Sequence, residues 1–134
     1  MKNISLMISA AVFLLSYSQS IQAKYVFIAK DDSQATKLCV ATGNNDLSQV
    51  KKSIKKLYLV STESNKRARV ATLSIQCNDL NLVEFAANFD ANDTFDYFNK
   101  KAPKHMRLPS DEISIEDINA RAKAPIQTII VSAN

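Results

Sequence analysis

The clearest hydrophobic pattern in this chain lies between Leu47 and Tyr58. Apolar residues recur there every three or four positions, which is the spacing of an amphipathic helix. Asp46 precedes the segment and Gln49 follows three residues later, as in a capping box. The pattern therefore predicts a helix that begins after Asp46.

A second helix is predicted just before this one. Asp31, Asp32 and Ser33 supply side chains that cap helix N-termini, and one apolar face then runs to about Thr42. Gly43 is suited to the left-handed residue that ends a helix. Together the two segments predict a helical hairpin.

Strand patterns occur at both ends of the chain and near its middle. Tyr25–Ala29 and residues 126–132 are rich in β-branched and aromatic residues. Apolar and polar residues alternate from Ala71 to Cys77, which predicts a half-buried strand with Cys77 pointing inward, after a polar loop over residues 61–69. We expect the terminal strand to pair with one of the other two.

Two further helices are predicted after Cys77. One begins at Asn78-Asp79 and the other is capped by Asp93. Their aromatic residues have helical spacing, which favours a core over a ligand pocket. Residues 100–125 read as a basic, proline-flanked connector with an additional helix from about Ser114. The fold class expected is a small α+β domain, with the helices packed on a short sheet of two or three strands.

The N-terminal residues have the layout of a secretory signal peptide. Lys2 precedes an apolar run from Ile4 to Leu15, and a polar tract then ends at Ala23. We expect residues 1–23 to be removed and residues 24–134 to form one domain, without a transmembrane segment. The expected location is the bacterial periplasm, with secretion as the alternative.

The number of cysteines is informative for a protein in the periplasm or outside the cell. Cys39 and Cys77 are the only two cysteines, and an oxidising environment favours a disulfide between them. Neither a Cys-x-x-Cys motif nor zinc-ligand spacing is present. The sequence therefore predicts one structural disulfide, closing a loop with a sequence separation of 38 residues.

Positive charge gathers on the second predicted helix and in the segment after it. The formal net charge is +4, and +3 without Lys2, which is too mild to indicate nucleic-acid binding. The lysines of the helix fall opposite its apolar stripe, so they form either a solvated face or a surface for an anionic partner. This candidate surface comprises Lys51, Lys52, Lys55, Lys56, Lys66, Arg67 and Arg69.

Catalytic and metal-binding patterns are weak. His105 is the only histidine, lies in a basic tract, and has no nucleophile motif around it. The acidic residues near Asp93 have Phe95 where a calcium loop requires glycine. We therefore expect no catalytic residues, no metal and no cofactor.

One further pattern combines the cap residues before the first helix with the two cysteines. It consists of Asp31, Asp32, Ser33, Leu38, Cys39 and Cys77. With this pattern the chain resembles a family of small exported bacterial proteins described only as a domain of unknown function. The resemblance covers about Val26 to Phe98 and leaves out the segment from Lys100 onward. It implies a periplasmic or secreted location and paired cysteines, and it brings no catalytic residues.

The expected function is non-catalytic binding of another protein of the cell envelope. The first alternative is recognition of an anionic glycan or lipid surface, such as lipopolysaccharide, through the lysine-rich helix face. The second alternative is a small enzyme or an enzyme inhibitor.

Overall fold

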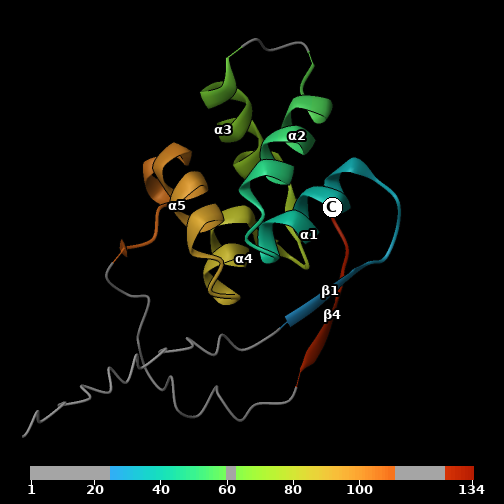
Figure 1. The fold of residues 1–134 in the computed structure, drawn as a ribbon. Coiled ribbons are helices and arrows are strands. Elements are labelled where there is room, and N and C mark those ends of the chain that lie inside the picture. The colour runs from blue at the N-terminus through green and yellow to red at the C-terminus, as the bar shows by residue number, and fades with distance from the viewer. Residues whose placement is uncertain (1–24, 60–62, 111–125) are drawn as a thin grey trace, which may run out of the picture.

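The structure, a computed structural model, describes residues 25–59, 63–110 and 126–134. Helices make up most of this part, and two short sheets complete the expected α+β class (Figure 1). The predicted helix from about Ser114 lies outside the described residues. In chain order the elements are β1 (Tyr25–Ala29), α1 (Gln34–Gly43), α2 (Leu47–Leu57), α3 (Ser64–Ser74), β2 (Gln76–Cys77), β3 (Leu80–Asn81), α4 (Leu82–Asn88), α5 (Asn92–Lys101), the 3₁₀-helix η1 (Lys104–Met106) and β4 (Gln127–Val131).

The two ends of the described chain meet in a parallel sheet. β4 pairs with β1 in a register that sets Tyr25 opposite Gln127 and Ala29 opposite Val131. Beyond β4, Asn134 exchanges backbone hydrogen bonds with Gln76, so the last residues also lie against β2. β2 itself pairs with β3 in an antiparallel hairpin. The terminal strand thus pairs with Tyr25–Ala29, one of the two partners expected from the sequence.

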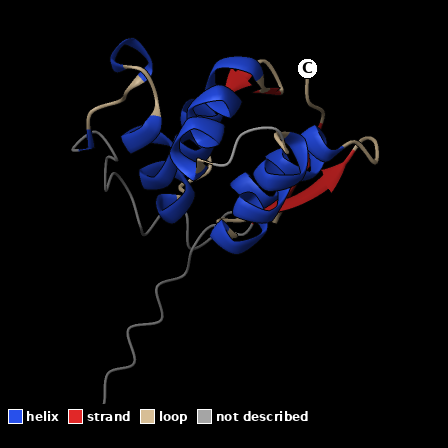
Figure 2. Ribbon diagram, turned by 90° about the horizontal axis from the view of Figure 1, so that it is seen from above, coloured by secondary structure: helices blue, strands red, loops and turns tan. Residues whose placement is uncertain are grey.

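Aromatic side chains from β1 and α4 pack together on the inner side of the parallel sheet. Phe85 and Phe89 lie 4.9 Å apart between ring centroids, and each approaches Phe27, at 6.0 and 5.0 Å. Phe95 and Phe98 of α5 are also buried, as expected for a core rather than a pocket. Two views at right angles show the helical part lying to one side of β1 and β4 (Figure 2).

The predicted strand at Ala71–Cys77 is wrong, and so is the predicted loop from residue 64 onward; residues 61 and 62 lie outside the described residues. Residues 64–74 form α3, and of the proposed strand only Gln76 and Cys77 belong to a strand, β2. Burial follows a helical period, with Ala68, Ala71 and Thr72 inside and Leu73 exposed. Alanine is the strongest helix former, and its small side chain lets α3 pack closely on α5. The apolar alternation that suggested a strand was accidental.

The predicted start of the next helix is also displaced. Asn78 and Asp79 form the turn between β2 and β3, with φ of 47° and 67°, instead of beginning α4. Asn81 is the N-cap of α4, and its side chain and that of Glu84 form a complete capping box. The inward face of this helix consists of the buried residues Leu82, Val83, Phe85 and Ala86.

Gly43 has a different role from the one predicted. It ends α1 but has no positive φ, and the residue with left-handed backbone conformation nearby is Asn45, with φ of 57°. A Cβ atom at Gly43 would lie 2.6 Å from two atoms of the Phe27 ring. Glycine is needed here because β1 packs its aromatic ring directly on the backbone of α1.

Asn45, not Asp93, caps α5. The Asn45 Oδ1 atom accepts hydrogen bonds from the backbone N–H groups of Asp93 and Thr94, at 2.8 and 3.1 Å. Ala91 is the N-cap residue by position and has no side chain able to cap. The loop between α1 and α2 therefore supplies the cap for a helix 48 residues further along the chain.

We expect Asn45→Ala to lower the free energy of unfolding by about 1–3 kcal/mol, measured by urea denaturation. The cap accounts for roughly 0.5–2 kcal/mol and the left-handed backbone for about 1 kcal/mol more. Asn45→Gly is the matched control, because it also removes the cap but tolerates the positive φ. Its cost should be smaller than that of alanine; an alanine variant as stable as the original protein would contradict the capping role.

Candidate functional site

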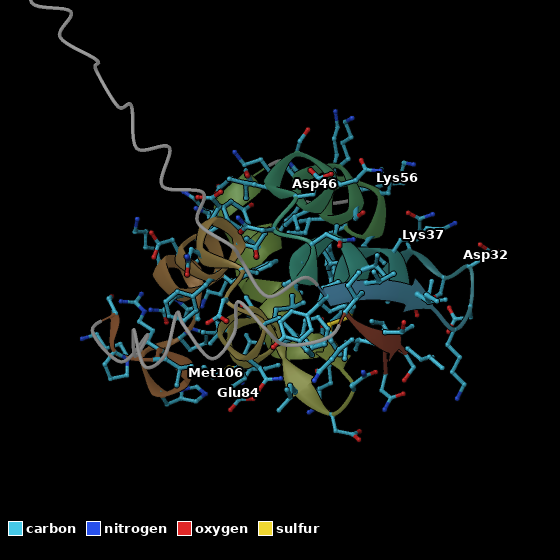
Figure 3. The ribbon with its side chains drawn as sticks, turned by 60° about the horizontal axis from the view of Figure 1, so that its bottom comes forward. Asp32, Lys37, Asp46, Lys56, Glu84 and Met106 are labelled. Carbon is cyan, nitrogen blue, oxygen red and sulfur yellow. A yellow bond between two sulfur atoms is a disulfide. The ribbon has the colours of Figure 1, made fainter. Side chains whose placement is uncertain are left out.

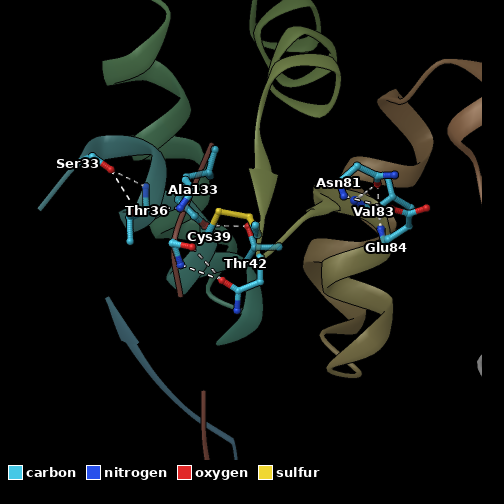
Figure 4. The surroundings of a disulfide bond; sticks show 12 residues. Ser33, Thr36, Cys39, Thr42, Asn81, Val83, Glu84 and Ala133 are labelled. Atoms are coloured by element: carbon cyan, nitrogen blue, oxygen red, sulfur yellow. Dashed lines mark hydrogen bonds between the residues drawn. A yellow bond between two sulfur atoms is a disulfide. The ribbon is translucent and has the colours of Figure 1, made fainter. Parts of the chain in front are cut away.

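The disulfide between Cys39 and Cys77 lies in the core and joins α1 to β2. Both cysteines are fully buried, and no other cysteine is present in the chain. Figure 4 shows the bond between the two sulfur atoms and its surroundings. Beside them, the Thr36 hydroxyl oxygen accepts a hydrogen bond from the Ala133 backbone N–H at 3.3 Å. Because β2 also pairs with residues 132–134, the disulfide fixes α1 against both β2 and the C-terminus. The predicted disulfide is confirmed, and its buried position indicates a structural role.

The structure divides the four predicted lysines of α2 between two sides of the helix. The Lys51 Nζ atom lies 5.7 Å from the centre of the Tyr97 ring, on the side of α5, where Lys101 also approaches the ring, at 4.3 Å. Lys52 and Lys56, one helical turn apart, instead line a groove on the side of α1. Lys55 is exposed. The lysines of α2 therefore do not form a single continuous surface.

The three predicted cations of α3 lie apart from this groove. Lys66 forms an ion pair with Glu63 at 3.0 Å, and both side chains are largely exposed. Arg67 is half-buried and Arg69 is exposed. None of the three lines the groove. The candidate surface predicted from the sequence thus separates into a set on α2 and a set on α3.

The groove between α1 and α2, here called the α1–α2 groove, has a volume of about 250 Å³. Its apolar lining residues are Val40 and Ala41 of α1 and Ala29 of β1. Lys37 of α1 joins Lys52 and Lys56 of α2 in the lining, so cations come from both helices. Figure 3 shows Lys37 and Lys56 on the same side of the molecule. Lys37 was missed from the sequence because nothing in its own helix marks it as part of a charged cluster.

The acidic groups near the α1–α2 groove are occupied or solvated. Asp46 lines the groove and caps α2, with its Oδ1 atom accepting the Gln49 N–H at 2.9 Å. Asp32 lies 3.7 Å from the Lys37 Nζ atom, but its side chain is fully exposed. At Asp31 the hydrogen bonds from the Ser33 hydroxyl and backbone N–H lower the pKa of the carboxyl group. The groove is lined by three lysines and one aspartate, so its net charge is positive.

A second surface, on the far side of the parallel sheet from the helices, is apolar. Val26 and Ile28 of β1 and Ile126 and Ile130 beside and within β4 are 40–65% exposed. Ile28 and Ile130 are directly opposite each other in the register. These four residues are called the outer sheet face below. Along each strand these residues are an even number of positions apart and so share one face, but only the pairing of β1 with β4 makes them one patch.

The remaining features considered are the single histidine, possible metal-binding clusters and possible membrane-spanning helices. His105 lies exposed in η1. Within residues 25–59, 63–110 and 126–134 no three His, Cys, Asp or Glu side chains gather where a metal ion could bind. In the same ranges, no helix combines the length and apolar character needed to cross a bilayer.

These features define a class: a small α+β domain with one buried disulfide and two exposed surfaces of contrasting character. Residues 38–120 match the family described as "Protein of unknown function (DUF3718)", and the chain belongs to that family. The match includes both cysteines and extends to residue 120, so it takes in part of the segment from Lys100 onward that the resemblance left out. It begins at residue 38, so Asp31, Asp32 and Ser33 lie outside it. No curated protein and no solved structure matches the chain.

Proposed function

We propose that the chain is exported to the bacterial periplasm and acts there as a non-catalytic module that binds another protein of the cell envelope. The signal-peptide pattern of residues 1–23 and the disulfide support export. The observation that carries the binding proposal is the outer sheet face, with four large aliphatic side chains open to solvent. Contiguous apolar patches of this kind often mark protein interaction sites.

The parallel pairing of β1 with β4 strengthens this proposal. Parallel sheets in proteins almost always have both faces covered, and their strands are accordingly apolar on both sides. Here Phe27 and Val131 face the helices, whereas Ile28 and Ile130 face away from them. Covering that second face removes apolar area from water, at about 25 cal/mol per Å². A binding partner is one way to complete the sheet.

The patch also indicates what kind of surface the partner presents. Its centre contains only aliphatic side chains and Thr128, whereas the charged residues Lys30, Asp31 and Asp32 follow the end of β1. An apolar centre with charges at its rim is typical of protein–protein interfaces. We therefore propose a partner protein with an uncharged apolar surface, held in a complex that moderate salt weakens little.

Site-specific photo-crosslinking in intact cells tests this proposal. A benzoylphenylalanine is placed at Ile28 or Ile130, with Leu73 of α3, also about half-exposed, as the matched control position. We expect both sheet positions to link the same periplasmic protein and Leu73 not to link it. The linked protein, once purified, should bind the domain, and Ile28→Asp should weaken that binding by roughly tenfold or more, since it buries a charge in the interface.

Other crosslinking results would contradict the proposal in recognisable ways. A link within one chain would mean that another segment of this protein covers the outer sheet face. A link between two identical chains would mean that the face is a dimer interface. No link at either sheet position, or equal linking at Leu73, would mean that the face is not a specific docking surface.

A further inference from the structure

We propose that the α1–α2 groove binds an acidic sugar, meaning one sugar unit that carries a phosphate or carboxylate group. This site is on a different surface from the outer sheet face and does not depend on the protein-binding function. The inference starts from the three lysines that the two helices bring to one groove: Lys37 of α1 and Lys52 and Lys56 of α2. The sequence alone predicted only an anionic surface as the partner of the α2 lysines, and the groove narrows the partner to an acidic sugar.

The charge of α2 has no structural explanation within the helix itself. Its sequence, Leu-Ser-Gln-Val-Lys-Lys-Ser-Ile-Lys-Lys-Leu, contains four lysines and no acidic residue. Lys52 and Lys56 are separated by four positions, where like charges destabilise a helix by about 0.2–0.5 kcal/mol. In the described part of the chain, neither of them forms an ion pair. An anion bound in the groove would relieve this repulsion.

Lys37 is available from the opposite wall. Its only ion pair within the described residues is the 3.7 Å contact with Asp32, whose side chain is fully solvated. Such exposed pairs contribute about 0–1 kcal/mol and are easily exchanged for another anion. Lysine ammonium groups bind phosphate and carboxylate as compact point charges, without a fixed geometry. Three of them around one groove favour a ligand with one concentrated negative group.

The other polar residues of the groove favour a sugar over a bare anion. The amide-bearing residues Gln34, Asn44 and Gln49 line it, and their side chains form no hydrogen bond within the described part of the chain. The hydroxyl-bearing Ser53 lies between Lys52 and Lys56 in sequence and also contributes. Amide groups both donate and accept, as sugar hydroxyls require. Val40 and Ala41 provide an apolar surface for the face of a ring.

The size of the groove sets the size of the bound unit. Its volume of about 250 Å³ is slightly below the roughly 300–1,000 Å³ of pockets that enclose drug-sized ligands. The groove therefore holds one sugar ring with its acidic group, and any longer glycan continues into solvent. The same chemistry occurs in lipid-anchored glycans and in free polysaccharides, and both sources fit the groove.

Titration of the ¹⁵N-labelled protein, followed by NMR, tests the assignment. The probes are glucose 6-phosphate, glucuronate, inorganic phosphate and glucose. We expect the two acidic sugars to shift the amide signals of groove residues, with at least roughly threefold tighter binding than inorganic phosphate or glucose. Phosphate bound as tightly as glucose 6-phosphate, or glucose bound as tightly as either acidic sugar, would overturn the assignment.

Matched variants on the same helix distinguish binding in the groove from a general effect of the protein's net charge. Lys52→Gln/Lys56→Gln should weaken glucose 6-phosphate binding by roughly tenfold or more, since a hydrogen bond to a charged group contributes about 1.5–3 kcal/mol. Lys51→Gln/Lys55→Gln changes the net charge equally and should alter binding by less than about twofold. Equal weakening by the two double variants would overturn the proposal.

The source of the sugar is distinguished with two further probes. Vesicles that contain lipopolysaccharide present acidic sugars on a lipid, and soluble polygalacturonate presents them in a free chain. Binding to either one, lost in Lys52→Gln/Lys56→Gln, supports the assignment and identifies the source. Binding to neither would overturn it. Because Ile28 and Ile130 lie outside the groove, this result is independent of the crosslinking result.

Discussion

Replacing Cys39 and Cys77 together by alanine is expected to lower the free energy of unfolding by about 4 kcal/mol. A disulfide that closes a loop of 38 residues removes chain entropy from the unfolded state, and the loop-closure relation gives this value at 25 °C. Small domains have only about 5–15 kcal/mol of stability in total. The change should therefore remove a large fraction of it, measured by denaturant unfolding.

The position of the bond explains why the loss should affect distant parts of the chain. Cys77 lies in β2, which pairs with residues 132–134, and those residues continue directly from β4. Cys39 lies in α1, which packs against β1 through Gly43. Without the bond, only non-covalent contacts hold α1 directly against β2 and the C-terminal residues 132–134.

Reduction of the unmodified protein provides the control for this prediction. A thiol reductant should lower its stability by a similar amount, whereas it should not affect the double alanine variant. A loss below about 1 kcal/mol in the double variant would contradict the structural role. Double replacement is preferable to a single one, because it leaves no free thiol buried in the core.

Truncation of Phe85 is the second large effect we expect. Phe85→Ala should lower the free energy of unfolding by about 3–5 kcal/mol, because it removes a fully buried ring and leaves a cavity. The ring lies between Phe89, at 4.9 Å, and Phe27, at 6.0 Å between centroids. Its loss therefore weakens the attachment of β1 to α4 as well as the packing of α4 itself.

Leu73→Ala is the matched control for Phe85, measured by the same denaturant titration. Leu73 is a large apolar residue on α3 that is 55% exposed, so its truncation should change stability by no more than about 0.5 kcal/mol. A Phe85→Ala variant that loses less than about 1.5 kcal/mol would show that the aromatic cluster is not a tightly packed part of the core.

Local sequence signals predicted the elements whose determinants lie within a few residues. The apolar spacing from Leu47 to Leu57 and the Asp46 cap predicted α2 correctly. Asp31, Asp32 and Ser33 predicted the start of α1, and Ser33 is the N-cap among them. The runs rich in β-branched and aromatic residues predicted β1 and β4. Capping hydrogen bonds and hydrophobic periodicity act over one or two turns, and the sequence displays them directly.

The prediction failed where two periods fit the same short segment. Apolar residues at Ala71, Leu73, Ile75 and Cys77 alternate as in a strand. Ala68, Ala71, Thr72 and Ile75 also fit one face of a helix, and these are the buried residues. Over so few residues the pattern does not discriminate, and the packing of α3 against α5 decides between the two.

The candidate surfaces also depend partly on local sequence and partly on tertiary packing. The sequence identified Lys52 and Lys56 as exposed cations, but grouped them with Lys51 on one continuous face. Only the packing of α1 beside α2 brings Lys37 to the first two and leaves Lys51 beside Tyr97 of α5. The outer sheet face likewise requires the pairing of two strands from opposite ends of the chain.

By itself, the sequence determined the cysteine pair, the amphipathic helix, the terminal strands and the α+β class of this protein. The tertiary structure alone decided that 64–74 is a helix, that Asn45 caps α5, and which charges share a groove. The physical reason is the distance along the sequence over which each interaction acts. Backbone capping and side-chain periodicity are local interactions, whereas close packing and surface clusters depend on residues that only folding brings together.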